Sequence, residues 1–185
     1  MKYENVTMKG NANEFRFSLT KEGNRKLVVF GVNPSTANEQ IADLTITKVM
    51  GFAERNGFDG FIMLNLYPQR CTNPESLDKE IDEELQRKNL EAIRLSVGDM
   101  KEPIVLLGFG DTINLRPYLK RCLKEIIDML APNNPQWKNV GTLTKNGNPR
   151  HLSRVGYTSL SDFNMQEYIS TSVSYTHLRA HETEL

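Results

Sequence analysis

Short, unbroken runs of apolar residues constrain the fold of this chain more than any other feature of its sequence. Three runs stand out, at residues 27–32 (LVVFGV), 61–66 (FIMLNL) and 103–108 (PIVLLG), and a weaker one spans residues 139–143. Unbroken rather than alternating runs are typical of parallel strands that are covered on both faces. The runs therefore predict a buried, mainly parallel, four-stranded sheet.

The segments between these runs carry apolar residues at helical spacing. Residues 46–53 place four apolar side chains at i, i+3, i+4 and i+7, and residues 81–93 contain a second stripe. Residues 119–130 contain the clearest stripe, and Pro117 is tolerated in the first turn of that helix. Alternating strands and helices require right-handed crossovers, so we expect an α/β fold with a three-layer, doubly wound sheet and flanking helices.

The two ends of the chain differ from this pattern. Residues 14–19 and 26–30 flank the turn signal KEGN, which predicts an N-terminal hairpin. Residues 1–171 contain no internal repeat or linker and are expected to form a single α/β domain. Residues 172–185 are expected to be a non-native or disordered tail, because the sequence from residue 173 onward resembles a translated sequencing adapter.

The composition argues against several classes of protein. The 23 basic and 23 acidic residues balance, so the domain is poorly suited to coating nucleic acid without specificity. No apolar run approaches the roughly 20 residues of a membrane span, and no N-terminal run is typical of a signal peptide. Cys71 and Cys122 have no metal-ligand spacing. We expect a monomeric cytoplasmic protein with no metal, no cofactor and no membrane contact.

Functional groups are expected on the loops that follow the predicted strands. In an open parallel sheet, ligands bind beyond the carboxyl ends of the strands. Four segments occupy such positions: residues 31–37 (GVNPSTA), 65–74 (NLYPQRCTNP), 108–112 (GFGDT) and 144–154 (TKNGNPRHLSR). Each carries polar side chains that a plain connection would not need.

Several residues in or near these loops also have a purely structural interpretation. The sequence NPS in the first loop is typical of a turn that closes a strand. Asp43 fits a helix N-cap better than a catalytic acid, and Asp111 is expected to cap the helix after it. Asn89 is expected to be hydrogen-bonded structure, and Cys71 a small buried side chain rather than a nucleophile.

Four motifs, GVNPSTA, DLTI (residues 43–46), LNLYPQRCTNP and TKNGNPRH, resemble the family called domain of unknown function 1643. The resemblance extends from about Phe15 to Tyr157 and rests on four motifs in order. The chain is more distantly similar to the uracil-DNA glycosylase superfamily, in which a G-x-N-P loop follows the first strand and an H-P-S-type loop comes near the end. That similarity implies a uracil-DNA glycosylase-like fold.

The distant resemblance implies roles for three neutral side chains. Asn33 would hold the attacking water near the sugar C1′, and Asn65 would read a base edge with its paired donor and acceptor. His151 would donate to a base carbonyl as negative charge develops there. Taken without the resemblance, Asn65 can equally well satisfy backbone groups of its own loop.

The same resemblance implies further substrate-binding residues. Pro34 and Ser35 come from the first loop, and Tyr67 is a candidate to stack on a base. The residues expected near phosphates are all cationic: Arg70, Lys145, Arg150 and Arg154. The alternative for the last three is an ordinary solvated loop.

The sequence departs from the glycosylase pattern at two points. Asn33 replaces a carboxylate and cannot take a proton from water, and Leu152 follows His151 where a proline is usual. Three hypotheses remain open. The protein is a hydrolase of the N-glycosidic bond of a damaged base in DNA, a hydrolase or binder of free nucleotides or nucleosides, or a non-catalytic nucleic-acid-binding relative. Action on duplex DNA would require an extruded nucleotide.

Overall fold

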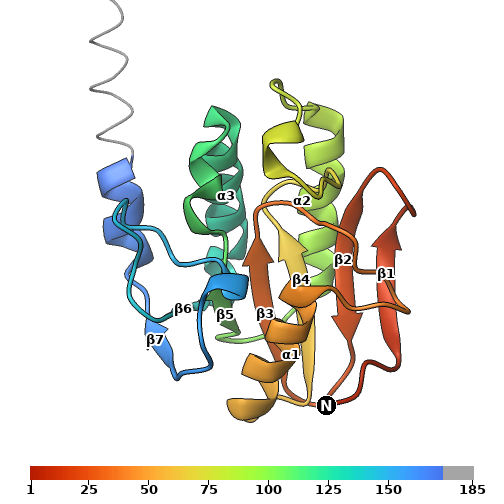
Figure 1. The fold of residues 1–185 in the computed structure, drawn as a ribbon. Coiled ribbons are helices and arrows are strands. Elements are labelled where there is room, and N and C mark those ends of the chain that lie inside the picture. The colour runs from red at the N-terminus through yellow and green to blue at the C-terminus, as the bar shows by residue number, and fades with distance from the viewer. Residues whose placement is uncertain (173–185) are drawn as a thin grey trace, which may run out of the picture.

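A seven-stranded mixed sheet forms the centre of the computed structural model, which describes residues 1–172 (Figure 1). The strand order is β1-β2-β4-β3-β5-β6-β7. The strands are β1 (Val6–Gly10), β2 (Arg16–Lys21), β3 (Lys26–Gly31), β4 (Gly60–Asn65), β5 (Ile104–Leu107), β6 (Gln136–Val140) and β7 (Leu160–Asp162). The chain is therefore a mixed α/β protein, and the expectation of a four-stranded sheet was wrong.

The parallel part of the sheet is confined to its centre. Strand β3 pairs in parallel with β4 and β5, and β5 pairs in parallel with β6. The pairings β1–β2, β2–β4 and β6–β7 are antiparallel. The buried apolar runs thus predicted the central strands, whereas the more polar outer strands gave no comparable signal.

The predicted hairpin between residues 14–19 and 26–30 does not form. Both segments are strands, but β4 lies between them, and β2 pairs with β1 instead. All six residues of β4 are buried, so this strand needs a neighbour on each side. The KEGN turn accordingly passes over the start of β4, where the Asp59 carboxylate accepts the backbone N–H groups of Asn24 and Arg25.

Three long helices cover the sheet, and all three match predicted stripes. They are α1 (Leu44–Arg55), α2 (Glu83–Val97) and α3 (Pro117–Leu130), and a further helix starts at residue 165. Short 3-10 helices lie at η1 (Pro74–Ser76), η2 (Gly110–Asn114), η3 (Ala131–Asn133) and η4 (Leu152–Arg154).

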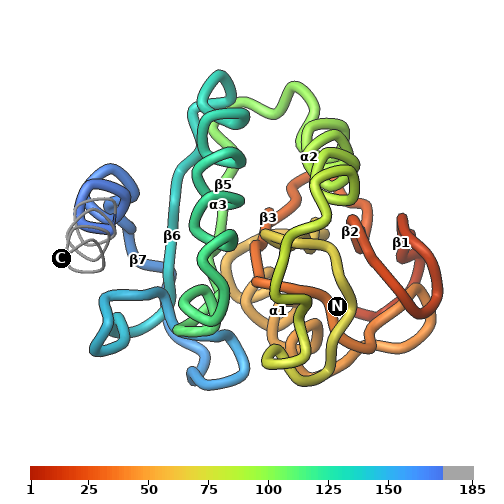
Figure 2. Tube along the Cα trace, turned by 90° about the horizontal axis from the view of Figure 1, so that it is seen from above, coloured from red at the N-terminus to blue at the C-terminus, as the bar shows by residue number. Residues whose placement is uncertain are grey.

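The sheet separates two apolar cores, which form the layers of the domain. Along β3, Val28 and Phe30 point into the core shared with α2 and α3, whereas Leu27 and Val29 point into the core shared with α1. Helices α1 and α2 accordingly lie on opposite sides of β3 (Figure 2). Burial on both faces explains why β3 is unbroken in its hydrophobicity.

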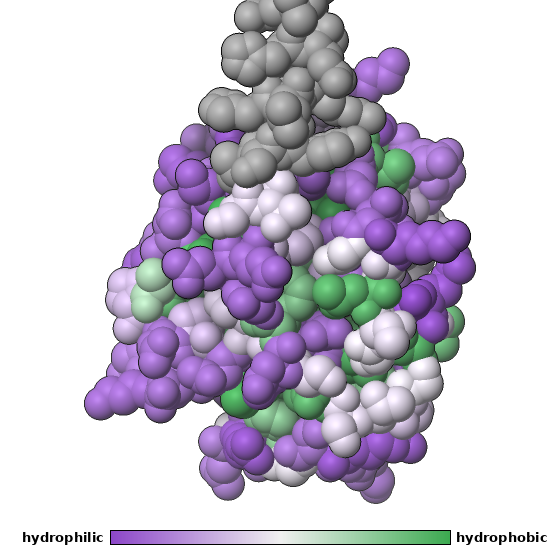
Figure 3. Space-filling view, turned by 90° about the vertical axis from the view of Figure 1, so that its left-hand side faces the viewer, coloured by the Kyte–Doolittle hydropathy of each residue, from purple (hydrophilic) through white to green (hydrophobic). Residues whose placement is uncertain are grey.

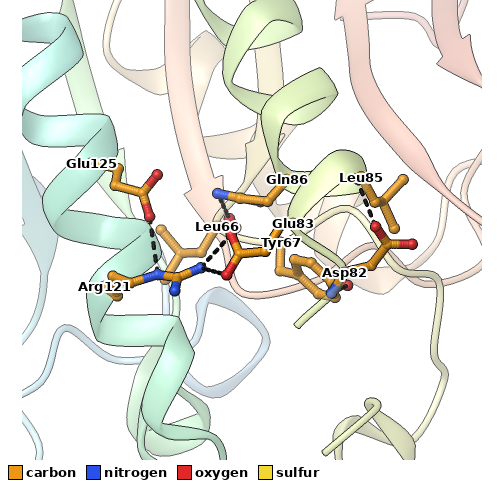
Figure 4. A network of polar contacts seen from close by, with 8 residues as sticks. All are labelled: Leu66, Tyr67, Asp82, Glu83, Leu85, Gln86, Arg121 and Glu125. Atoms are coloured by element: carbon orange, nitrogen blue, oxygen red, sulfur yellow. Dashed lines mark hydrogen bonds and ion pairs between the residues drawn. The ribbon is translucent and has the colours of Figure 1, made fainter. Parts of the chain in front are cut away.

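Polar contacts between α2, α3 and β4 fix the loop that leaves the sheet at β4 (Figure 4). On the surface, Arg121 of α3 pairs with Glu83 of α2 and Glu125 of α3. The buried Gln86 amide donates to the Leu66 carbonyl at 3.1 Å, and the Tyr67 hydroxyl accepts the Asp82 N–H. Exposed ion pairs contribute little, so the buried amide contact does most to hold this strand end.

The described residues include no helix long and apolar enough to cross a membrane. The face at the β7 edge is mostly polar, with a few apolar side chains between the polar ones (Figure 3). The adapter-like segment predicted at residues 173–185 lies outside the described residues.

Candidate functional site

A cavity of about 170 Å³ opens at the carboxyl ends of β3, β4 and β5. Asn33, Asn65 and His151 all line it, although they come from loops far apart in the chain. The loops after parallel strands were expected to meet at this edge of the sheet. The other polar residues that line the cavity are Arg16, Ser35, Asp43, Thr45, Cys71, Thr72 and Thr112.

Asn33 is held by the backbone of two loops. Its Nδ2 donates to the carbonyl of Pro34 at 3.2 Å and to that of Cys71 at 3.0 Å. Both amide hydrogens are therefore used, and the side-chain oxygen is the polar atom left to face a ligand. Such an atom can accept a hydrogen bond from a water molecule and fix its position.

Asn65 ends β4 and is 1% exposed. Its backbone carbonyl accepts from Asn89 at 3.1 Å, which confirms the structural role predicted for Asn89. The Asn65 Oδ1 receives a long contact of 3.5 Å from Arg16 Nη2, and its Nδ2 has no partner. A side chain at Gly31 would come within 3.0 Å of that Nδ2, so glycine keeps the space beside the amide open.

Arg16 is a cavity residue that the sequence analysis missed. It begins β2 and is 2% exposed, yet no acidic side chain in the described residues forms an ion pair with it. Its Nη1 donates to the Ala37 carbonyl at 3.1 Å, and its Nε has no partner. Burial lowers the pKa of Arg16 to about 10, which leaves the guanidinium charged at neutral pH. The sequence did not indicate a role for Arg16, because the strand that it begins was not expected to reach the cavity.

His151 lines the cavity in its neutral form. Its Nδ1 accepts the Ser153 backbone N–H at 3.2 Å and lies 2.7 Å from the Ser153 hydroxyl. A nitrogen that accepts a backbone N–H carries no proton, so the proton of the neutral ring belongs on Nε2. Burial, with a smaller effect from Arg154, lowers the pKa of His151. The ring can thus donate one neutral hydrogen bond into the cavity.

Asp43 is the helix N-cap that was predicted, and it also lines the cavity, which was not predicted. Its carboxylate accepts the Ile46 N–H at 2.9 Å, which confirms the N-cap of α1. It also accepts the Ala37 N–H at 3.2 Å. In addition, Asp43 lines the cavity and is the only carboxylate among the described residues that does so. The sequence spacing gave the cap but not this location.

The loop before His151 is held by Asp111, contrary to the predicted helix cap. The N-cap position of η2 is Phe109, whereas the Asp111 carboxylate accepts from Thr144 Oγ1 at 2.6 Å and Asn148 Nδ2 at 2.8 Å. The Gly110 N–H donates to the Pro149 carbonyl at 2.8 Å. Asp111 therefore ties the η2 segment to the His151 loop, a long-range contact that local sequence signals do not reveal.

The other predicted binding residues are distributed more widely. Ser35 lines the cavity. Cys71, which was expected to be a small buried side chain, also lines it and is only half-buried, and burial raises the pKa of its thiol. Arg70 donates to the Ser35 and Ala37 carbonyls. Arg150 donates to the Thr142 carbonyl at 2.7 Å. The predicted binding residues that do not line the cavity are Pro34, Tyr67, Arg70, Lys145, Arg150 and Arg154.

Comparison with known proteins identifies one family. The family described as protein of unknown function (DUF1643) matches residues 16–151, which is more than half of the chain. The matched segment begins at Arg16 and ends at His151, so it contains all the residues that line the cavity except Leu152. No curated protein and no solved structure matches the chain. Within residues 1–172, no group of three or more histidine, cysteine or acidic side chains could hold a metal ion.

Proposed function

The chain belongs to the DUF1643 family, and we propose that it hydrolyses the N-glycosidic bond of a nucleobase bound in the cavity. One observation carries the proposal: Asn33, Asn65 and His151 come from three separate loops and line one concave space. The order of these loops is similar to that of the uracil-DNA glycosylase superfamily. A uracil-DNA glycosylase-like arrangement of the central strands is part of the proposal.

The size and polarity of the cavity suit a single base. A cavity of 150 Å³ accommodates a benzene ring in a protein interior, so about 170 Å³ has room for one six-membered ring. The Asn65 Nδ2 has no protein partner, and the His151 Nε2 carries the ring proton. Two donors directed at one ligand favour a base with carbonyl oxygens.

The proposed reaction assigns each polar group a task. The Asn33 oxygen holds a water molecule against the sugar C1′, and the bond between C1′ and the base nitrogen breaks. Negative charge then develops on the leaving base, where His151 and Asn65 donate hydrogen bonds to it. Asn33 cannot accept the proton of the water, whereas the Asp43 carboxylate in the same cavity can. Asp43 thus supplies the acid–base group that the loop sequence lacks.

Two substrate classes are compatible with this cavity. A base in DNA is the first candidate, because of the likeness in loop order. Free nucleosides or nucleotides are the second, because Arg70 and Arg150, which were expected near the phosphates of a DNA strand, donate to backbone carbonyls instead. A relative that binds a base or nucleic acid without turnover would share the same geometry.

Release of free base is the measurement that tests the proposal. Purified protein is incubated with single- and double-stranded oligonucleotides containing uracil or other deaminated bases, and with the matching nucleosides and nucleotides. Free base is then quantified by chromatography. We expect release from at least one substrate, reduced about 100-fold or more in His151→Ala because an electrostatic donor is lost.

Arg87→Ala is the matched control, since Arg87 is exposed on α2 and, within residues 1–172, forms an ion pair with Glu84 alone. It is expected to retain the full rate. No release from any substrate in the panel, by protein whose folding is verified, would refute the hydrolase. Saturable binding without release would identify the non-catalytic alternative.

A further inference from the structure

The buried guanidinium of Arg16 has no ion pair in the described part of the chain and is only partly hydrogen-bonded. Its exposed fraction is 2%, its Nε has no partner, and no carboxylate lies within ion-pair distance. A buried charge without a paired opposite charge is strongly unfavourable for folding. A protein keeps such a group where something else, absent from the free chain, completes its environment.

A second cation increases the positive charge at this place. Arg70 and Arg16 both donate to the Ala37 carbonyl, at 3.4 and 3.1 Å. Arg70 also has a buried Nε without a partner. Two guanidinium groups thus share one carbonyl oxygen, and these like charges repel each other. The carboxylate of Asp43 acts against this repulsion at both arginines, and that of Glu39 at Arg70.

Asp43 is the negative group nearest to this pair within the cavity, but it does not neutralise Arg16 directly. Its two carboxylate oxygens accept the backbone N–H groups of Ile46 and Ala37, and it forms no ion pair with either arginine. The Tyr3 hydroxyl donates to the Asn38 carbonyl and offers no charge at neutral pH. The part of the cavity beside Arg16 therefore has a guanidinium without an ion pair and two unused donors, although Asp43 favours the charged form of Arg16 from beyond ion-pair distance.

We infer that Arg16 and Asn65 form an oxyanion-binding subsite of the cavity, which takes a phosphate or carboxylate group. The unpartnered Arg16 Nε and Asn65 Nδ2 are its donors, and Arg70, which shares the Ala37 carbonyl with Arg16, adds a second positive charge. Because the Asn65 Nδ2 carries two hydrogens, it can donate to the oxyanion and to a base at once. Charged hydrogen bonds of an arginine to an oxyanion are among the strongest in proteins. This inference concerns binding alone and does not require the hydrolytic reaction.

Ligand-dependent thermal stability tests the subsite. The full chain is titrated with inorganic phosphate, with acetate, and with uridine and uridine 5′-monophosphate as a matched pair without and with a phosphate. Binding to the folded state alone raises the melting temperature by mass action, by about 5–10 °C at a hundred times the Kd. Calorimetric titration then supplies the Kd.

Two substitutions assign the binding to Arg16. Arg16→Met removes the charge and is expected to weaken anion binding at least tenfold, while the protein without ligand keeps or gains stability because a buried charge is gone. Arg16→Lys keeps the charge without the planar donor group and is expected to bind with intermediate affinity. Arg87→Met is the control at an exposed arginine and is expected to bind as the wild type does.

The outcomes separate the sources of the anion. Stabilisation by phosphate or acetate alone supports a free oxyanion, and stabilisation by the nucleotide but not the nucleoside supports a nucleotide phosphate. The inference is overturned if no anion stabilises the wild type. It is equally overturned if Arg16→Met and Arg16→Lys bind anions as tightly as the wild type does.

Discussion

The Nδ1 atom of His151 accepts the backbone N–H of Ser153 at 3.2 Å. This contact makes His151 the N-cap of η4 and assigns the proton of the neutral ring to Nε2. Protonation of Nδ1 would break the contact and place a cation near Arg154, which already lowers the pKa of the ring together with burial. The loop geometry and the protonation state of its histidine are therefore coupled.

This coupling predicts that stability falls in mildly acidic solution. The pKa of His151 is lowered on folding from an unfolded value of about 6.5, so the unfolded chain binds the extra proton more readily. The contribution of neutral His151 to stability is fully present above its unfolded-state pKa, and it is lost as the pH falls through its lower pKa in the folded state. Urea denaturation of the wild type between pH 7.5 and 5.0, expressed as the free energy of unfolding, measures it.

His151→Asn is the matched variant for this prediction. Asparagine is a good N-cap residue and can still accept the Ser153 N–H, but it does not titrate. The two remaining histidines, His177 and His181, are present in both proteins and cancel in the comparison. Identical pH profiles for wild type and variant would show that His151 is not the group responsible.

Asp43 allows its structural and chemical roles to be separated. Asp43→Asn keeps an N-cap acceptor for the Ile46 N–H but removes the proton acceptor, and its amide nitrogen cannot accept the Ala37 N–H. We expect its free energy of unfolding to fall by about 1 kcal/mol with the Ala37 contact, and that of Asp43→Ala to fall by about 1 kcal/mol more with the cap. Base release is expected to fall at least about 100-fold in both, as for loss of a general base.

Denaturation curves and base-release rates of the two variants together check this prediction. If Asp43→Asn releases base at the wild-type rate while Asp43→Ala is merely less stable, Asp43 is a helix cap and nothing more. The proton of the water would then have to go to another acceptor.

The fold was predictable where burial leaves a strong pattern. The runs that became β3, β4 and β5 are apolar on both faces, and the stripe of α3 has one clear apolar side. Strand pairing was not predictable from the KEGN turn. The same turn can join β2 and β3 as neighbours in a hairpin, or join them across a third strand, β4, that lies between them. The choice depends on β4 needing two neighbours, which is a property of the whole sheet.

The site was predictable to the extent that it follows directly from strand ends. Asn33, Asn65 and His151 lie just after such ends, and their loops meet in space. Arg16 could not be found in this way, because it begins an antiparallel strand and reaches the same edge from the opposite direction. The misassigned cap at Asp111 has a similar cause, since its partners lie more than 30 residues away.

Asp111 is expected to control the order of the His151 loop. Asp111→Ala removes the acceptor shared by Thr144, Asn146 and Asn148, so the loop loses these side-chain contacts with η2 and keeps the backbone bond from Gly110 to Pro149. We expect faster amide hydrogen exchange over residues 142–150 and little change in the central strands. Asp128→Ala, at a carboxylate on α3 that makes no such contacts with the loop, should leave exchange in residues 142–150 unchanged. Exchange measured by mass spectrometry would contradict the prediction if the two variants behaved alike.

The same contacts predict a second pH effect, which arises from hydrogen bonds to a carboxylate rather than from burial of an imidazole. Hydrogen bonds from Thr144, Asn148 and Asn146 lower the pKa of Asp111. Protonation of the Asp111 carboxylate is thus disfavoured in the folded loop. The stabilising contribution is complete above the unfolded-state pKa of about 3.9, and it is lost as the pH falls through the lower pKa of the folded state. Loop exchange in the wild type, corrected for the intrinsic pH dependence, should rise toward that of Asp111→Ala only in this acidic range.

Leu152 anchors the histidine loop in the core on the α1 side of the sheet. It is 1% exposed and packs so closely on Gly108 that a side chain at Gly108 would lie 2.7 Å from the Leu152 Cγ. Leu152→Ala is expected to cost about 2–5 kcal/mol by leaving a cavity, whereas Leu152→Met, which conserves volume, should cost less than about 1.5 kcal/mol. Because the neighbouring His151 depends on this anchor, base release should decline in Leu152→Ala even at temperatures where the variant is fully folded. Equal rates per folded molecule in the two variants would mean that the Asp111 contacts alone are enough to hold the imidazole in place.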